Sequence, residues 1–329
     1  MLPAAVPRVI VGTSRIGTVW PDAMATSRSR EPAFALLDAA VALGCSALDT
    51  AASYQLGGTE RVLGAWMSSR RNRDRLFLIS KGGLPYPIVK PHRLDFASLS
   101  QDLHGSLRRL GTDRLDLFLL HRDDQNAPLD RVLEAMSAFE RQGKIRAWGV
   151  SNWSHRRIEA MAGLASSAEG PPIAASSPHF SLFDWAAPPW PGCVSIAGAA
   201  NGDARAYYER TQTPVLAWSP LGAGFFSAAA RGVGAWWSVR AYDSRENRAR
   251  RERAIALATK YERSPVEVAL AYVFSHPFPV FAVVSSSTAE KMKRNLQAAT
   301  WRLSPDELCW LESGDRIESG PRAPASRRV

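Results

Sequence analysis

The sequence predicts an α/β protein that folds as one closed (β/α)8 barrel, the architecture also called a TIM barrel. Eight short apolar runs alternate with longer amphipathic segments along almost the whole chain. The 329 residues suit a single barrel with long loops, and no linker or shift in composition divides them. Because a strand followed by a helix, repeated eight times, is the pattern of a closed parallel barrel, we expect this fold.

The expected strands are short apolar runs between turn-forming residues. In chain order they are Arg8–Ile16, Ser46–Asp49, Leu76–Lys81, Leu115–His121, Ile145–Val150, Ile173–Ser176, Val215–Trp218 and Val280–Val284. The expected helices carry apolar residues at helical spacing. They are Glu31–Leu43, Thr59–Ser69, Phe96–Leu110, Leu129–Gln142, His155–Ala165, Asp203–Arg210, Arg248–Tyr261 and Ala289–Ala299. Two further helices are expected at Pro265–Ser275 and Pro305–Leu311, because proline suits a first helical turn.

Two long loops break this alternation. The segment Pro188–Gly192 follows the sixth strand, and the residues from Gly222 to Asn247 follow the seventh. Both loops belong to the rim at the C-terminal ends of the strands, where barrel enzymes keep their active sites. We expect the barrel to span residues 1–318, and the polar, basic residues 319–329 to form a flexible tail.

The composition excludes several classes of protein. With 46% hydrophobic and 22% charged residues, the chain is neither disordered, collagen-like nor a disulfide framework. Its 41 Lys and Arg residues against 31 Asp and Glu give a formal net charge of +10, which favours an anionic partner. The basic clusters at residues 70–73 and 245–253 are interpreted as solvated surface, without interleaved aromatic residues. The net charge alone leaves nucleic acid, a membrane surface and an anionic small molecule open as partners, and the lack of a nucleic-acid motif argues against the first.

The cysteines and the apolar segments bear on location. Cys45, Cys193 and Cys309 form no CxxC pair, so neither a disulfide scaffold nor a zinc site is expected, and we interpret them as buried, inert thiols. The N-terminus does not resemble a signal peptide. A glutamate and two prolines interrupt the apolar segment 266–284, which argues against a membrane span. We expect a cytoplasmic protein that does not bind membranes; the sequence does not indicate an oligomeric state.

Polar residues stand at the ends of three neighbouring predicted strands. Asp49 closes the second strand, Lys81 the third and His121 the fourth. Taken singly, Asp49 could cap a helix, His121 could be a core histidine and Lys81 a surface lysine. Because a parallel barrel brings all its strand ends to one rim, an acid, a cation and an imidazole would converge there. Their convergence predicts a catalytic site.

Five motifs, in order, resemble those of the aldo-keto reductase family. They are Leu48-Asp49-Thr50-Ala51-Ala52-Ser53-Tyr54 with Glu60 and Leu63-Gly64, Ile79-Ser80-Lys81, Asp116-Leu117-Phe118-Leu119-Leu120-His121, Gly143-Lys144-Ile145-Arg146, and Gly149-Val150-Ser151-Asn152. The likeness extends from about Val9 to Leu296. It implies hydride transfer between a nicotinamide cofactor and a carbonyl, with Asp49, Tyr54, Lys81 and His121 as a catalytic tetrad.

The implied roles have a physical basis. Tyr54 would donate a proton to the carbonyl oxygen as that oxygen becomes alkoxide-like. The ammonium of Lys81 would lower the pKa of Tyr54 toward working pH, and Asp49 would keep Lys81 charged and oriented. His121 would polarise and position the carbonyl.

The same resemblance implies a set of cofactor contacts. Its members are Ser151, Asn152 and Ser177 at the nicotinamide carboxamide, Trp218 stacked on the ring, Ser219, Leu221 and Gly222 over the pyrophosphate, and Ser285, Ser286, Lys291 and Asn295 around the adenosine phosphates. Ser177 replaces the usual glutamine, and Trp218 the usual tyrosine. Lys291 falls where an arginine often meets the 2′-phosphate, and hydroxyl groups near a helix N-terminus suit phosphate, so NADPH is favoured over NADH.

Aromatic residues and one arginine are the candidates for the substrate pocket. They are Trp20, Tyr86, Arg122, Trp153, Trp185, Trp190 and Trp236. Such a wall suits a bulky or ring-shaped ketone or aldehyde. Two other functions remain open from the sequence: a lyase or aldolase that forms a Schiff base on Lys81, and a non-catalytic sensor or channel-associated subunit that holds NADPH.

Overall fold

Eight parallel strands form a closed barrel in the chain order β1 to β8, as the sequence predicts. The computed structural model describes residues 6–16, 27–85, 92–225 and 236–315. The strands are β1 (Val9–Gly12), β2 (Ala47–Asp49), β3 (Phe77–Gly82), β4 (Leu117–Leu120), β5 (Trp148–Ser151), β6 (Ser176–Ser177), β7 (Val215–Trp218) and β8 (Val280–Val284). Hydrogen bonds between β1 and β8 close the barrel.

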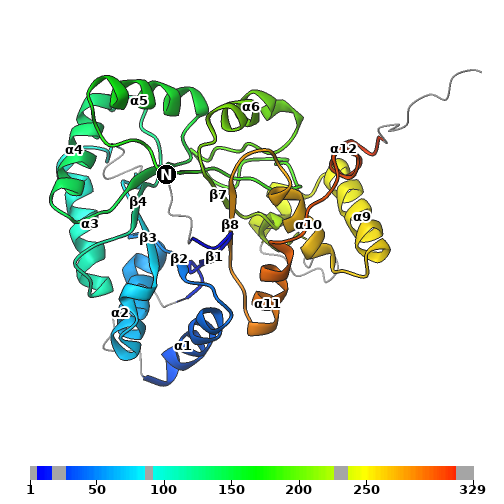
Figure 1. Cartoon of the computed structure of the whole chain (residues 1–329), viewed down its shortest axis with the longest axis horizontal. Helices are drawn as coiled ribbons and strands as arrows, with labels where there is room; N and C mark the ends of the chain where they lie inside the picture. The colour runs from blue at the N-terminus through cyan, green and yellow to red at the C-terminus, as the bar shows by residue number, and fades with distance from the viewer. Residues whose placement is uncertain (1–5, 17–26, 86–91, 226–235, 316–329) are drawn as a thin grey trace, which may run out of the picture.

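Helices surround the strands (Figure 1). They are α1 (Ser27–Ala42), α2 (Gly58–Arg70), α3 (Phe96–Leu110), α4 (Leu129–Arg141), α5 (His155–Ser167), α6 (Gly202–Thr211), α8 (Trp236–Tyr242), α9 (Arg245–Lys260), α10 (Pro265–Phe274), α11 (Ala289–Ala298) and α12 (Pro305–Ser313). In Figure 1, α9 and α12 lie together at the edge of the molecule, and Arg253 of α9 donates to the carbonyl of Leu311 in α12.

Local signals explain where the most regular helices begin and end. Helix α3 has its predicted bounds, because Asp95 accepts a hydrogen bond from the backbone of Ser98 and Gly111 ends the helix with a φ of 64°. Helix α9 begins three residues earlier than predicted, because Ser244 caps it. The segment Trp236–Tyr242, expected within a loop, forms the short helix α8.

Strand residues alternate between the inside of the barrel and the layer under the helices. Ile79, Leu117 and Leu119 belong to the inner apolar cluster, whereas Phe118 and Leu120 belong to the outer cluster that packs against the helices. Lys81 and His121 share the parity of the inner residues of β3 and β4. Their side chains therefore enter the barrel at its C-terminal end.

The opposite rim of the barrel has a buried cluster of ion pairs around Asp116. Asp116 is 2% exposed, forms ion pairs with Arg73 and Arg146, and accepts a hydrogen bond from the backbone N–H of Leu78. The interpretation of residues 70–73 as solvated surface was therefore wrong for Arg73. Its guanidinium is largely buried because it neutralises this carboxylate.

Two cysteines also differ from expectation. Cys45 is buried, but Cys193 and Cys309 are half-buried, because they lie in the loop after β6 and on the surface helix α12. In the described part of the chain, no helix is long and apolar enough to cross a membrane, and no group of three metal-binding side chains is found. The predicted tail, residues 319–329, lies outside the described residues.

Candidate active site

Lys81 is at the centre of the predicted tetrad. Its ammonium donates to Asp49 Oδ2 at 2.8 Å, to the Thr50 carbonyl at 2.9 Å and to the Tyr54 hydroxyl at 3.0 Å. These contacts use all three donors of the ammonium group. Lys81 is 4% exposed and Asp49 is 3% exposed, so the ion pair lies in the protein interior.

The loop after β2 brings Tyr54 to this ion pair. The backbone N–H of Ala52 donates to the carbonyl of Lys81 at 3.0 Å, which fastens the loop to β3. Tyr54 then opens a 3₁₀ turn, Tyr54–Gly57, in which Gln55 and Leu56 have positive φ angles. Such left-handed conformations cost energy in non-glycine residues, and they cluster at functional sites.

His121 completes the group. Its ring meets the Tyr54 ring edge-on, with centroids 6.0 Å apart and an interplanar angle of 79°. Its backbone N–H donates to the carbonyl of Gly82 at 2.8 Å, which fixes the end of β4 against β3. The structure therefore brings together all four residues that the sequence singled out.

The electrostatics of the group differ from the sequence expectation in one respect. Burial raises the pKa of Tyr54 above its usual value, and the nearby Lys81 ammonium only partly opposes this rise. Burial alone would lower the pKa of Lys81, but Asp49 and Tyr54 raise it, so the amine stays charged. Burial, with the charges of Lys81 and Arg122, holds the pKa of His121 well below its usual value. The imidazole is therefore neutral.

The three residues predicted at the carboxamide are buried and bonded to the protein. Ser151 donates to the carbonyl of Ser177, and Ser177 donates to the carbonyl of Leu216. Asn152, with a φ of 59°, donates to Ser151 Oγ and accepts from the indole N–H of Trp218 at 3.2 Å. These side chains tie the ends of β5, β6 and β7 together.

Trp218 belongs to an aromatic cluster organised by His179, a residue that the sequence did not single out. His179 is fully buried, bonds to Ser195 Oγ at 2.8 Å and to the Tyr242 hydroxyl at 3.0 Å, and lies 5.1 Å from the Trp218 ring. Trp185 stacks on His179 with ring centroids 4.7 Å apart, and it also lies 5.7 Å from the Trp218 ring. His179 therefore links the loops after β6 and β7. Its place directly after a polar strand end was the only signal in the sequence.

The segment after β8 gathers hydroxyl, amide and ammonium groups at the start of α11. Ser286 Oγ accepts from Asn295 Nδ2 at 3.0 Å, and Ser287 Oγ accepts from Lys291 Nζ at 2.9 Å. Thr288 caps the helix. Ser285 instead donates to the carbonyl of Gly12, and Arg294, on the same helix, pairs with Glu290.

The loop after β7 begins with backbone in the left-handed region. Ser219 has a φ of 50° and Gly222 a φ of 55°. A Cβ atom at Gly222 would lie 2.6 Å from Phe183 of the loop after β6, so only glycine fits there. Leu221 packs against the outer apolar cluster. The two long loops thus meet at Gly222.

The residues predicted for the pocket wall lie in different environments. Trp153 is fully buried in the core, with the Arg157 guanidinium 5.3 Å from its ring centre, which argues against a substrate contact. Trp185 is half-buried and Trp190 is 46% exposed on the rim. Trp20 and Tyr86 lie outside the described residues, and for Trp236 only its place at the start of α8 is described.

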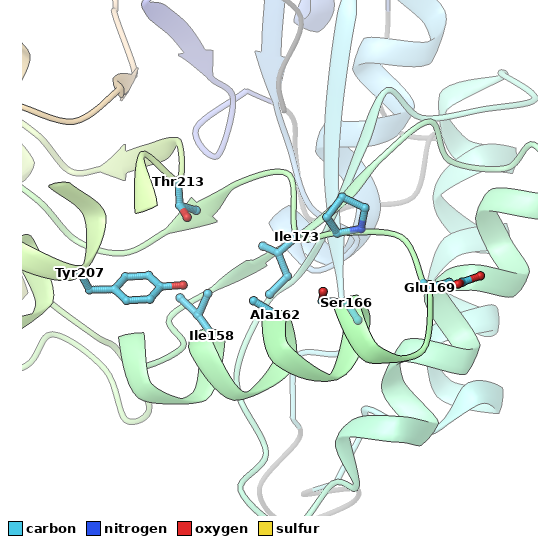
Figure 2. Close-up of a pocket in the computed structure, with 10 residues that line it drawn as sticks. Ile158, Ala162, Ser166, Glu169, Ile173, Tyr207 and Thr213 are labelled. Atoms are coloured by element: carbon cyan, nitrogen blue, oxygen red, sulfur yellow. The ribbon is translucent and has the colours of Figure 1, made fainter. Parts of the chain in front are cut away.

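A groove of about 450 Å³ lies elsewhere, between α5 and α6 (Figure 2). Figure 2 shows Ile158, Ala162 and Ser166 of α5 facing it, with Ile173 above them and Tyr207 at the left end beside Ile158. This groove belongs to the outer helical layer and contains none of the tetrad. We therefore assign the site from side-chain chemistry and not from the size of the groove.

Comparison with known proteins agrees with this geometry. The model of the Aldo/keto reductase family matches residues 8–314. The protein Tas of Escherichia coli is 27% identical over 94% of this chain and 96% of its own length. An aldo/keto reductase from Klebsiella pneumoniae, solved with NADP and acetate, is 27% identical, covers 93% of this chain and 90% of its own, and superimposes with a TM-score of 0.69. The thermostable aldo-keto reductase Tm1743, solved with the inhibitor epalrestat, gives a TM-score of 0.70 at 25% identity, covering 94% of this chain and 95% of its own.

Proposed function

Because the chain belongs to the aldo-keto reductase family, we propose that it reduces a ketone or aldehyde to an alcohol with NADPH, and that Tyr54 supplies the proton. The hydrogen bond of 3.0 Å between Lys81 Nζ and the Tyr54 hydroxyl is the observation that carries this proposal. This hydrogen bond connects a phenol, which can act as an acid, with a buried ammonium whose three N–H groups are all hydrogen-bonded.

The residues at the rim fit a dinucleotide phosphate. Ser286, Ser287, Lys291 and Asn295 meet at the N-terminus of a ten-residue helix, where hydroxyl donors, a cation and the helix dipole favour an anion. The relative from Klebsiella pneumoniae was solved with NADP. The cofactor, when bound, supplies the hydride.

The chain's own residues supply the proton. Tyr54 is protonated at neutral pH because burial raises its pKa, and the Lys81 ammonium stabilises the phenolate that forms when the proton leaves. Asp49 holds Lys81 in place. Neutral His121, edge-on to Tyr54, can donate a hydrogen bond to a carbonyl oxygen without adding charge.

The Schiff-base alternative has little support in this geometry. A lysine attacks a carbonyl as a neutral amine with a free lone pair. Lys81 has a raised pKa, and its three N–H groups are all hydrogen-bonded. An amine of this kind is a poor nucleophile, which favours a role beside Tyr54.

The replacement Tyr54→Phe tests the proposal. It is expected to lower the rate of NADPH oxidation with a carbonyl panel by about 10²- to 10⁴-fold, because a positioned acid is lost. Cofactor affinity, measured by NADPH fluorescence, is expected to persist. Tyr261→Phe is the matched control, since Tyr261 is 39% exposed and distant in sequence from the tetrad.

Three outcomes would contradict this function. An unchanged rate in Tyr54→Phe would exclude the phenol as the acid. Borohydride trapping of a carbonyl on Lys81 would instead favour a lyase. Tight NADPH binding with no consumption across the panel would favour a sensor.

A further inference from the structure

Arg122 lies at the C-terminal end of the barrel, next to the tetrad. Arg122 directly follows His121 at the end of β4, and its Nη1 donates to the His121 carbonyl at 2.9 Å. Its Nη2 donates to Cys193 Sγ at 3.3 Å, in the loop after β6. A Cβ atom on Gly192 would lie 3.4 Å from its Cδ, so this loop covers the side chain. The guanidinium therefore lies half-buried at the rim beside the tetrad.

In the described part of the chain, no acidic side chain forms an ion pair with Arg122. The next two residues are both acidic, but Asp123 pairs with Arg157 at 2.9 Å and Asp124 pairs with His92 at 2.8 Å. Among the residues that the structure describes, the two acceptors of the Arg122 guanidinium are a carbonyl and a sulfur atom. A guanidinium has five N–H donors, and a half-buried charge without a counter-ion is costly. Arg122 thus has both the charge and the free donors to bind an anion.

The topology separates this anion site from the cofactor phosphates. In a closed barrel of eight strands, β4 lies across from β8. The phosphate-binding candidates Ser286, Lys291 and Asn295 follow β8. Arg122 therefore lies on the side of the barrel opposite these phosphate candidates and next to His121 of the tetrad, where a substrate would lie if the cofactor occupied the β8 side. Its charge also acts on the tetrad, since it contributes to the low pKa of His121.

We propose that the substrate is an anionic carbonyl compound, with a carboxylate that binds the Arg122 guanidinium while its carbonyl oxygen meets Tyr54 and His121. This inference rests on the proposed function and narrows it to a substrate class. An arginine fork matches the two oxygens of a carboxylate, and such charge-assisted pairs are stronger than neutral hydrogen bonds.

Matched substrates test the proposal. The three regioisomers of formylbenzoate carry the anion at different distances from the aldehyde, and each has a neutral partner of the same shape, the formylbenzamide. The wild-type enzyme is expected to show a higher kcat/KM for at least one formylbenzoate than for its amide. In Arg122→Gln this ratio is expected to fall by about ten- to a hundredfold, the range for a hydrogen bond to a charged group. Arg122→Lys keeps the charge and is expected to retain part of the ratio.

The controls separate a charge effect from a structural one. Arg156→Gln removes an exposed arginine of α5 and is expected to keep the wild-type ratio. A loss of the same size for acid and amide in Arg122→Gln would show that Arg122 only holds the loop, and would overturn the proposal. If Arg122→Gln does not fold, the wild-type enzyme still tests the proposal. Equal kcat/KM values for every formylbenzoate and its formylbenzamide would overturn it.

A binding measurement keeps this test apart from the proposed function. Benzoate and benzamide are titrated into the enzyme with NADP⁺, with tryptophan fluorescence as the signal. Weaker benzoate binding in Arg122→Gln, by about tenfold, supports the anion site even if no aldehyde is reduced. Reduction of neutral aldehydes with no effect of Arg122 on either measurement would leave the reductase function standing and reject the anion site.

Discussion

Lys81 shows how one buried charge can set the working range of a neighbouring acid. It is the cation in contact with the Tyr54 hydroxyl, and it opposes the rise in pKa that burial imposes. Tyr54 must be protonated to reduce a carbonyl, so reduction should decline as the pH rises through the pKa of Tyr54. The position of this alkaline limb therefore reports the influence of Lys81.

The replacement Lys81→Met is expected to move the alkaline limb to higher pH and to lower kcat/KM for reduction by about 10²-fold. Without the ammonium, burial and the Asp49 carboxylate are opposed only by the more weakly acting charge of Arg122, which raises the pKa of Tyr54 and weakens it as an acid. A pH–rate profile at saturating NADPH measures both effects. Lys81→Arg keeps the positive charge, so the pH at which the rate declines should return close to the wild-type value. The rate itself should recover less, because a planar guanidinium cannot reproduce the three contacts of the ammonium. A limb that stays in place in Lys81→Met would contradict the electrostatic role.

At the scale of elements, the two long loops are coupled through Gly222. This glycine opens the short 3₁₀ turn Gly222–Gly224 after β7, and its missing side chain makes room for Phe183 of the loop after β6. The Phe183 ring in turn meets Phe225 edge-on at 5.2 Å. The two loops follow β6 and β7, and the ends of both strands hold candidate cofactor contacts. A substitution that breaks the contact between Gly222 and Phe183 should therefore also weaken NADPH binding.

We expect Gly222→Ala to destabilise the protein by about 1–3 kcal/mol, through a positive φ and a clash with Phe183. The dissociation constant for NADPH should rise as well, because the loop can no longer close against its neighbour. Gly224→Ala is the control, since Gly224 has a φ of 89° but open space around its Cβ position. Thermal unfolding and NADPH titration compare the two variants. Equal effects would mean that backbone strain alone, and not the contact between the loops, is responsible.

The same elements show what could be predicted from the sequence. Helix α3 and strands β7 and β8 have their predicted bounds, because capping residues and uninterrupted apolar runs mark their ends locally. Strand β6 was expected at Ile173–Ser176 but consists of Ser176–Ser177, since two residues are too few to show a period. The tetrad could be inferred because its members stand at strand ends. The role of His179 could not, because it depends on Tyr242 and Ser195, which only the folded loops bring to it.

At the scale of the whole molecule, three of the six histidines are held neutral by burial: His121 and His179 are buried and His276 is half-buried. Burial lowers the pKa of His179 to about 3 and that of His276 to about 4, and it holds the pKa of His121 well below 6.5. His276 meets Phe180, Tyr272 and Phe278, with Arg205 as the nearby charge. All three residues therefore resist protonation in the folded protein and accept it freely in the unfolded chain.

The sign of the resulting pH dependence follows from proton linkage. A folded-state pKa below the unfolded value of about 6.5 means that the unfolded chain binds more protons as the pH falls, so stability is full above pH 6.5 and is lost below it. For His276 the loss should continue to about pH 4, and for His179 to about pH 3. Each histidine should contribute about 1.4 kcal/mol per pH unit once the pH is well below 6.5.

We expect His276→Phe, which places a ring of similar size in an aromatic cage, to reduce the slope of unfolding free energy against pH by one such contribution between pH 6 and pH 5. Denaturant unfolding at several pH values measures the slopes. Equal slopes for His276→Phe and the wild type would show that His276 is protonated at the same pH in the folded and the unfolded state. Its burial would then not govern stability in acid.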